Sequence, residues 1–590
     1  MRRSRRCRQA ASRPRSSVAA DSPQLRRRGV PPHGLPATLH PVVARVLAAR
    51  GLIDPEQIAL ELRELLPPEG LLGIRQATDL LLDAVRSDRR IVIAGDYDAD
   101  GATAVALAVL GLRRLGARHV DYVVPNRLTM GYGLSPELAR EAAQAGAQLL
   151  VTVDNGIASL AGVDAARELG MQVLITDHHL PGTQLPRSDA LLNPNQPGCT
   201  FASKHLAGVG VMFYLLMSLR ARMREQGDFG SRSEPNLAEL LDLVALGTVA
   251  DLVRLDRNNR ILVSAGLARI RAGRARPGIR ALLEVAGRSE RELTATDLGF
   301  VLGPRINAAG RLDDIRIGIR CLLSDDADEA LTLARELDRI NRLRREMQAQ
   351  MNESALDQLV EATQDDAHGL SLFDPDWHEG IVGLVASRLR EHANRPACAF
   401  ARAQEEGVLK GSARSVPGLH LRDVLAHIDS HQPQLILRFG GHAMAAGLSL
   451  REDDLPRFRE AFDEACRERL TPAQLERVVE TDGPLDGAEL ALSTAQALEQ
   501  AGPWGQGLPE PLFEDEFEVA YAKPVGRDQS HVRYRLRGPR GTEIIAVDFG
   551  GATRLCTSGR VRVAYALSIN RWQGNESLEL RLTHLEAISP

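Results

Sequence analysis

The chain has few cysteines, and those it has are scattered. Its six cysteines form no CxxC pair, which argues against a zinc module or a disulfide scaffold and indicates a reducing cytosol. Long apolar runs are also missing: the longest are the size of single strands, so no membrane partner is expected. The net charge is only −4, so the charge of the whole chain does not favour nucleic acid, and any binding of nucleic acid must come from local arginines.

At 44% apolar and 25% charged residues, the composition is that of globular domains. A chain of 590 residues is too long for one core and predicts about three to five domains. Residues 1–38 differ, because they are rich in arginine, serine and proline and have no apolar periodicity. Their composition resembles a transit peptide or a DNA-binding arm, but we favour a disordered extension or a mis-assigned start codon.

Acidic and histidine clusters recur between residues 96 and 251, and most of them follow an apolar run. They are Asp96 to Asp100 within GDYDADG, Asp154-Asn155-Gly156, Asp177-His178-His179 and Asp251. The carboxyl ends of parallel strands line one crevice, so we expect these side chains to converge. Carboxylates in one crevice repel unless cations lie between them, and oxygen ligands with an imidazole suit Mn²⁺ or Mg²⁺. Two such ions are a standard device for phosphodiester hydrolysis, so the pattern predicts a metal-dependent phosphoesterase.

Each cluster alone also has a purely structural interpretation. The Asp154-Asn155-Gly156 sequence is typical of a turn, and Asp98 and Asp100 could cap a helix that begins near Ala102. The adjacent histidines are harder to explain in this way, because buried imidazoles need polar partners. The convergence of all the clusters favours a functional site.

The Asp177-His178-His179 motif, with the upstream GDYDADG and VTVDNG, resembles the DHH phosphoesterase superfamily, and further motifs resemble its RecJ branch. These are LGTVAD at 246–251, GPRINAAGR at 303–311, WHEG at 377–380, GSARS at 411–415 and GGH at 440–442. They follow the family's order from about residue 39 to near the C-terminus. The resemblance implies a 5′→3′ exonuclease that degrades single-stranded DNA to 5′-mononucleotides in DNA recombination and repair.

The expected fold is α/β with several domains. Alternating β-branched and helical runs predict a parallel-sheet DHH domain over 39–290. A phosphate-contact loop and a long connecting helix, without Gly or Pro from 326 to 361, occupy 291–365. The resemblance implies a smaller α/β domain of the DHHA1 type over 366–470. Five short strand candidates predict an OB-like barrel over 471–590. Any one of its aromatic residues could belong to the core, but the resemblance favours single-strand binding by the domain, for which Arg533, Tyr534, Arg535, Arg571 and Trp572 are suitable residue types.

The candidate metal centre, with two Mn²⁺ or Mg²⁺ ions as cofactor, draws on six residues. They are Asp96, Asp98, Asp100, Asp154, His178 and Asp251. Many DHH phosphoesterases carry a metal-binding histidine at the position of Ala94. Because this chain lacks that histidine, Asp96 is expected either to bind a metal ion or to support a residue that does. The expected catalytic residues are His179, which contacts the scissile phosphate or assists proton transfer, and Asp177, which orients a neighbouring histidine. The resemblance adds His442 near the scissile phosphate.

Substrate contacts are expected from two further groups. Arg305, Asn307 and Arg311 lie in a glycine-flanked segment that we interpret as a loop holding phosphates. Gly440 and Gly441 let the backbone approach a ligand closely. A hydroxyl and a guanidinium suit a phosphate, and the resemblance places Arg127, Ser412 and Arg414 around the 5′-terminal phosphate.

The resemblance also implies partners: single-stranded DNA, the single-strand-binding protein and a RecQ-type helicase, on the nucleoid in the bacterial cytoplasm. We expect a monomer, because no dimerisation stripe is left over. Two other functions stay open, a dinucleotide phosphodiesterase or pyrophosphatase and a non-catalytic single-strand-binding scaffold. The barrel and the long helix count against the first, and the intact set of ligand residues counts against the second.

Overall fold

The computed structural model describes residues 23–127, 130–230, 232–362, 367–527, 529–538 and 541–588. It divides into two compact units. The larger unit combines Arg27–Glu346 with Glu480–Pro590, and the smaller contains Met347–Val479 together with the chain up to Arg26. Most of the predicted N-terminal extension lies outside the described residues. No helix in the described part of the chain is both long and apolar enough to cross a membrane.

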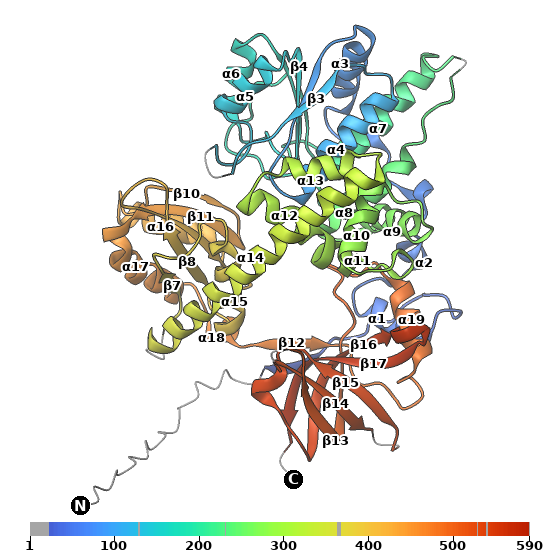
Figure 1. Cartoon of the computed structure of the whole chain (residues 1–590), viewed down its shortest axis with the longest axis vertical. Coiled ribbons are helices and arrows are strands. Elements are labelled where there is room, and N and C mark those ends of the chain that lie inside the picture. The colour runs from blue at the N-terminus through green and yellow to red at the C-terminus, as the bar shows by residue number, and fades with distance from the viewer. Residues whose placement is uncertain are drawn as a thin grey trace, which may run out of the picture. The chain divides into compact units, whose positions relative to one another are not determined.

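A five-stranded parallel sheet organises the first part of the larger unit (Figure 1). Its order is β3-β2-β4-β5-β6, which confirms the predicted parallel sheet. The strands are β2 (Ile91–Ala94), β3 (Val120–Val123), β4 (Leu149–Val153), β5 (Gln172–Thr176) and β6 (Ala190–Leu192). Strand β2 is buried on both faces: Ile91 and Ile93 join one apolar core, whereas Val92 and Ala94 join another. Such double burial explains why the strands are continuous apolar runs.

Helices cover both faces of this sheet. Helices α5 and α6 contribute to the core that holds Val92, whereas α4, α7 and α8 contribute to the other. The helices of this region are α3 (Ile74–Arg86), α4 (Ala99–Arg114), α5 (Pro136–Gln144), α6 (Leu160–Glu168), α7 (Gly208–Glu225), α8 (Leu241–Ala250), α9 (Arg257–Arg271), α10 (Pro277–Val285), α11 (Ala295–Asp297), α12 (Gly303–Leu312) and α13 (Arg316–Leu323). Helix α8 ends at Asp251, its C-cap, which delivers this carboxylate from a helix.

The glycine-flanked segment 303–311 was expected to be a loop, and this expectation is wrong. It forms helix α12, directly after a π-helical turn at Leu298–Leu302. Pro304 stands in the first turn, where a missing amide hydrogen costs nothing. Gly310 serves close packing, because a Cβ there would lie 1.8 Å from the carbonyl oxygen of Tyr97. The glycines therefore reflect tight contact between helix and loop.

The long helix α14 runs from Ala327 to Ala362, as its unbroken apolar spacing predicts. The smaller unit then forms a sheet of order β10-β11-β9-β8-β7. Its strands are β7 (Leu370–Phe373), β8 (Ala397–Arg402), β9 (Val408–Arg414), β10 (Arg438–Gly441) and β11 (Ala445–Arg451). Its helices are α15 (Val382–Ala393), α16 (Leu421–His431), α17 (Leu455–Arg467) and α18 (Pro472–Leu475).

The C-terminal strands close into a barrel of order β13-β14-β15-β17-β16, which confirms the OB-like fold. They are β13 (Phe513–Val525), β14 (His531–Arg537), β15 (Glu543–Asp548), β16 (Arg560–Asn570) and β17 (Ser577–Ala587), preceded by α19 (Leu492–Ala501). Buried Phe513, Tyr534 and Tyr565 fill its core.

The expected domain boundary at residue 39 does not follow the packing. Helix α1 (Pro41–Ala48), which precedes the short α2 (Pro55–Ile58), places Val42, Val46 and Leu47 in the core of the C-terminal barrel. Buried Arg50 also pairs with buried Asp482 at 2.6 Å. Residues before 39 also take part in the fold, because β1 (Gln24–Arg27) pairs with β12 (Val478–Thr481). The local sequence of α1 could not reveal a partner so far away along the chain.

Candidate active site and metal centre

The candidate ligands from the sheet edge and from α8 converge in the larger unit. Three sets of side chains place their ligand atoms within 4.8 Å of one another. The sets are Asp96, Asp98 and Asp154; Asp100, His178 and Asp251; and Asp154, His178 and His179. His178 Nε2 lies 3.1 Å from Asp154 Oδ1 and 3.5 Å from Asp251 Oδ2. All six predicted metal residues therefore belong to one continuous cluster.

The electrostatics of this cluster favour the uptake of cations. Burial, followed by the charge of Asp98, raises the pKa of Asp96 well above its usual range and that of Asp100 to about 7. Burial, followed by the charge of Asp100, likewise raises the pKa values of Asp154 and Asp251. So many acids cannot all be ionised together without positive charge between them.

Hydrogen bonding supports the same conclusion. Asp96 Oδ1, Asp154 Oδ1 and Asp251 Oδ2 are buried, and no donor among the described residues forms a hydrogen bond with them. Buried carboxylate oxygens are costly unless a partner satisfies them. A donor set of carboxylate oxygens and imidazole nitrogen fits Mn²⁺ or Mg²⁺, so the residues present fit the predicted cofactor.

The backbone around the cluster holds the carboxylates in place. Asp98 caps α4 by accepting from Gly101 N at 3.0 Å. Asp100 accepts from Gly208 N at 2.6 Å and from Val209 N at 3.0 Å, at the start of α7. Gly208 must be glycine, because a Cβ there would lie 2.5 Å from that of Asp154. Asp154 itself has a left-handed φ of 62°, an uncommon conformation for a residue with a side chain.

Asp177 acts as a clamp on the turn that carries the two histidines. It accepts from the amides of Ile157, His178 and His179, and its Oδ1 lies 2.8 Å from His179 Nδ1. Burial alone would raise the pKa of Asp177, but its hydrogen bond with His179 and the charge of that ring outweigh it, so the pKa is lowered. Burial would lower the pKa of His179, yet the same hydrogen bond raises it. The geometry is that of an orienting pair.

The sequence reasoning missed Tyr132. Its hydroxyl lies 2.9 Å from His179 Nδ1 and donates to the carbonyl of Asp154 at 3.2 Å. Its ring packs edge-on against Tyr97, at 6.3 Å between centroids. Tyr132 stands in a loop between a strand and a helix, within MGYG at 130–133, where no regular spacing marks it. Its neighbouring glycines were the only available signal.

The predicted phosphate-binding residues of the larger unit fall into two classes. The guanidinium of Arg127 lies 4.8 Å from the ring centre of Tyr97, and its positive charge partly offsets the rise that burial causes in the pKa of Asp96, so it belongs to the site. Asn307 Oδ1 accepts from Ala99 N at 2.7 Å and thereby holds the start of α4. Arg305 is buried and pairs with Asp338 at 2.9 Å, which is a structural contact. Arg311 follows on the same helix.

Ser412 and Arg414 lie side by side on β9 in the smaller unit. Arg414 Nη1 donates to Ser412 Oγ at 2.9 Å. A Cβ on Gly383, near the N-terminus of α15, would lie 3.0 Å from Arg414 Nη2 and from Ser412 Oγ. Strand β9 pairs with β8 on one side and with β11 on the other, so its backbone amides serve the sheet. The start of α15 supplies the helix terminus that favours anions.

The predicted Gly440-Gly441-His442 element spans the end of β10 and the first residue of the turn that leads into β11. His442 N donates to Ala445 O at 2.8 Å. Gly441 has a φ of 139°, and a Cβ there would lie 2.5 Å from Ala445 O, so this position requires glycine.

Of the barrel residues considered for DNA contact, Tyr534 is fully buried and belongs to the core. Arg571 is engaged by Glu499 and Glu576, each at 2.9 Å. Arg533 and Arg535 are exposed, and they face Lys523 and Tyr521 across the β13–β14 pairing. Exposed Phe549 follows the end of β15. The outer face of β13–β15 thus combines cations with aromatic rings.

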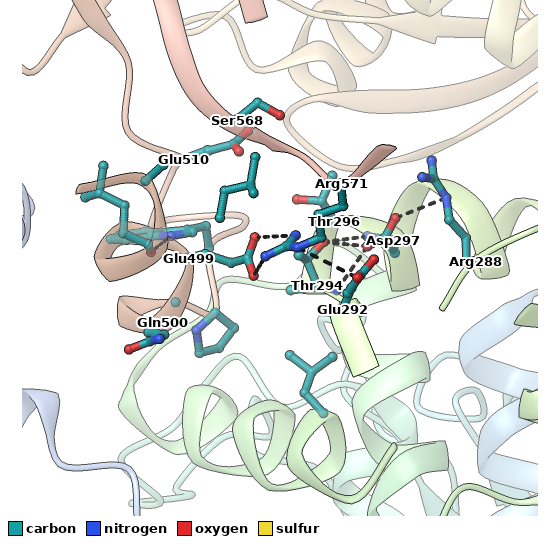
Figure 2. A pocket seen from close by; sticks show the side chains of 18 of the residues that line it. Arg288, Glu292, Thr294, Thr296, Asp297, Glu499, Gln500, Glu510, Ser568 and Arg571 are labelled. Carbon is teal, nitrogen blue, oxygen red and sulfur yellow. Dashed lines mark hydrogen bonds and ion pairs between the residues drawn. The ribbon is translucent and has the colours of Figure 1, made fainter. Parts of the chain in front are cut away.

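A cavity of about 810 Å³ lies elsewhere in the larger unit, lined by α9, α11, α19 and the end of β16. Figure 2 shows Arg571 between Glu499 and Glu292, and Arg288 directed toward Asp297. These arginines already have acidic partners. The cavity therefore does not offer the unsatisfied charge found at the metal centre.

Comparison with known proteins identifies each part of the chain. Residues 90–248 match the DHH family, N-terminal domain, residues 366–468 the DHHA1 domain, and residues 481–584 the RecJ OB domain. The chain is 51% identical to the single-stranded-DNA-specific exonuclease RecJ of Dickeya dadantii and 49% identical to that of Escherichia coli. Each alignment covers 95% of this chain and 99% of the relative.

A solved structure agrees with these sequence matches. The crystal structure of RecJ from Thermus thermophilus in complex with Mn²⁺ is similar, with a TM-score of 0.78 and 32% identity, covering 97% of this chain and 80% of that one. A structure of the same protein with Mg²⁺ has a TM-score of 0.72 over 94% of this chain and 75% of that one, at 31% identity. The convergent carboxylates, the closed barrel and near-complete alignment lead to one conclusion: the chain belongs to the RecJ family, within the DHH phosphoesterases.

Proposed function

We propose that this chain degrades single-stranded DNA from the 5′ end and releases 5′-mononucleotides, with Mn²⁺ or Mg²⁺ as cofactor. The observation that carries the proposal is the cluster of acids in which three buried oxygens, on Asp96, Asp154 and Asp251, have no hydrogen-bond donor among the described residues. Relatives of this chain are named single-stranded-DNA-specific exonucleases, and the crystal structure of one relative is in complex with Mn²⁺. The chain is accordingly a phosphodiester hydrolase.

The roles of the cluster follow from its contacts. Asp98, Asp100, Asp154, His178 and Asp251 would hold two ions, and Asp96 would contribute from beside Asp98. Two such ions supply an activated water and neutralise the charge on the departing oxygen. Asp177 keeps His179 in one orientation, and the raised pKa of His179 suits a ring that donates a proton to a phosphate oxygen.

The 5′ polarity would come from the Ser412 and Arg414 pair. A terminal phosphate monoester carries more charge than an internal diester, and a guanidinium beside a hydroxyl matches it. The N-terminus of α15, which Gly383 brings close to both side chains, adds a favourable dipole. Two further residues are candidate phosphate contacts: Arg127, beside Tyr97 in the larger unit, and His442, in the smaller unit.

The rest of the DNA strand would contact cationic and aromatic side chains of the barrel. The outer face of β13–β15 offers Arg533, Arg535 and Lys523 with exposed Tyr521 and Phe549. Stacking on aromatic rings and pairing with phosphates bind single strands without sequence preference. Arg311 remains a candidate phosphate contact, whereas buried Arg305 supports α14.

The cellular role follows the family. We expect action in recombination and repair on the bacterial nucleoid, as a monomer, together with a RecQ-type helicase and the single-strand-binding protein. The helicase would supply the single strands that the enzyme degrades.

End-labelled substrates test the polarity. A single strand labelled at its 5′ end should release labelled mononucleotide at once in Mn²⁺, whereas a 3′-labelled strand should shorten progressively. A duplex of the same sequence and a dinucleotide serve as controls. Immediate release from the 3′ label, or faster cleavage of the dinucleotide than of the strand, would contradict the proposal.

A further inference from the structure

Two histidines lie one turn apart on helix α16 of the smaller unit, on the same face. The ring centres of His427 and His431 are 4.0 Å apart, with planes tilted by 38°. Side chains at i and i+4 on a helix are neighbours, and two histidines at this spacing can bind one metal ion. Neither belongs to the metal cluster of the larger unit.

The hydrogen bonds of His431 orient its ring for metal binding. Its Nδ1 lies 2.9 Å from the carbonyl oxygen of His427 and 3.1 Å from Ser430 Oγ. A carbonyl accepts only from a protonated nitrogen, so Nδ1 carries the hydrogen and Nε2 carries the lone pair. Metal-binding histidines are commonly held by such a bond from the other ring nitrogen.

A carboxylate approaches the pair from a second helix. Glu468 is the C-cap of α17, and its Oε2 lies 3.7 Å from His427 Nε2. The same carboxylate pairs with Arg469 at 3.1 Å. Its side chain is 54% exposed and that of His427 is 29% exposed, so both can rotate toward a shared ion. An exposed ion pair of this kind contributes little to stability, so a bond to a metal ion can replace it.

We propose that His427, His431 and Glu468 form a second metal site, for a borderline ion such as Zn²⁺, Ni²⁺ or Cu²⁺. Two imidazoles and one carboxylate suit these ions better than Mn²⁺ or Mg²⁺. The bound ion fastens the end of α16 to the end of α17. Because Leu421 N, at the start of α16, donates to Ala443 O in the β10–β11 turn, the ion also braces the helix that supports the Gly440-Gly441-His442 element.

Metal counting on the full chain, without a polyhistidine tag, tests this site. The catalytic centre is weakened first by Asp154→Asn, and all further variants carry that change. The protein is dialysed against buffered Zn²⁺, and bound zinc is measured by mass spectrometry. His431→Ala should bind one Zn²⁺ fewer than its parent, and Glu468→Gln should bind this ion about tenfold or more weakly.

The matched control is His420→Ala, since His420 precedes the same helix and is 48% exposed beside Asp423. It should keep the full zinc count. Equal counts for His431→Ala and its parent would overturn the proposal, as would an equal loss in His420→Ala, which would reveal only adventitious binding by surface imidazoles. In the wild-type background, His431→Ala should leave nuclease turnover in Mn²⁺ unchanged, while Zn²⁺ should raise its melting temperature less than that of the wild type.

Discussion

The metal cluster of the larger unit and the Ser412–Arg414 pair of the smaller unit are built on opposite electrostatic principles. The cluster buries acids beside acids, so burial, followed by the charges of neighbouring acids, raises their pKa values. The pair instead places a guanidinium and a hydroxyl near the start of α15, where positive potential accumulates. One region therefore favours a cation and the other an anion.

This difference indicates that the metal cluster carries out hydrolysis, whereas the Ser412–Arg414 pair selects the end of the DNA strand. A carboxylate cluster supplies chemistry to any phosphodiester, because it recognises no particular end of the strand. A cationic pair performs no hydrolysis, but it distinguishes a phosphate monoester from a diester by charge. Damage to the first should remove turnover on every substrate, whereas damage to the second should alter only the choice of substrate. The experiments below separate these outcomes.

The largest effect is expected from Asp154→Asn. Asparagine tolerates the left-handed backbone at this position but removes a charge that two ions would share. Turnover should fall about a thousandfold or more, since several kcal/mol of charge stabilisation are lost. Nucleotide release in Mn²⁺ gives the rate, and fluorescence anisotropy should find single-strand affinity nearly unchanged. Near-native turnover would exclude Asp154 as a ligand.

The second region should respond selectively to Arg414→Ala. One charge-assisted hydrogen bond contributes about 1.5–3 kcal/mol, so kcat/KM on 5′-phosphorylated strands should fall roughly ten- to a hundredfold. Strands with a 5′-hydroxyl should lose much less. Arg402→Ala is a matched control, because Arg402 is an exposed arginine of the neighbouring strand β8 that pairs with Glu452. An equal loss on both kinds of 5′ end would refute the pocket.

Removal of the ions should make stability depend on pH. The acids of the cluster have higher pKa values when folded than when unfolded, so the folded state binds more protons between these values. For Asp100 this range extends from about 3.8 to about 7. The metal-free protein should therefore lose stability as pH rises through this range, and Mn²⁺ should raise the melting temperature more at pH 8 than at pH 5.5.

Thermal melts in EDTA and in Mn²⁺ check this dependence. Asp154→Asn provides the comparison, because it removes one of the acids with a raised pKa and should flatten the pH profile of the metal-free protein. A constant effect of Mn²⁺ across this pH range would mean that the acids do not titrate together with folding.

Local pattern predicted much of this molecule, and long-range packing explains where it failed. The parallel strands, the long α14 and the barrel are marked by regular spacing of apolar residues, and the acids at the strand ends converge as parallel topology requires.

The prediction of a loop at 303–311 was wrong because glycine is typical both of loops and of close packing, and Gly310 serves close packing. The placement of α1 in the barrel core depends on contacts more than 400 residues away along the chain. The partner of Arg305, Asp338, lies 33 residues away on α14, so local pattern could not reveal their pairing either.

The smallest effect is expected from Tyr132→Phe, which tests whether Tyr132 acts with the metal cluster. The hydroxyl contacts His179 and the carbonyl of Asp154, but the ring keeps its edge contact with Tyr97 when the oxygen is removed. Loss of one neutral hydrogen bond, about 0.5–1.5 kcal/mol, predicts a two- to tenfold fall in kcat. The fall should be equal on 5′-phosphorylated and 5′-hydroxyl strands, because Tyr132 contacts residues of the metal cluster and not the 5′ end of the DNA.

Tyr122→Phe is the control, since Tyr122 lies on strand β3 and outside the cluster. A loss confined to phosphorylated ends would assign Tyr132 to the anion pocket and would redraw the division between the two regions.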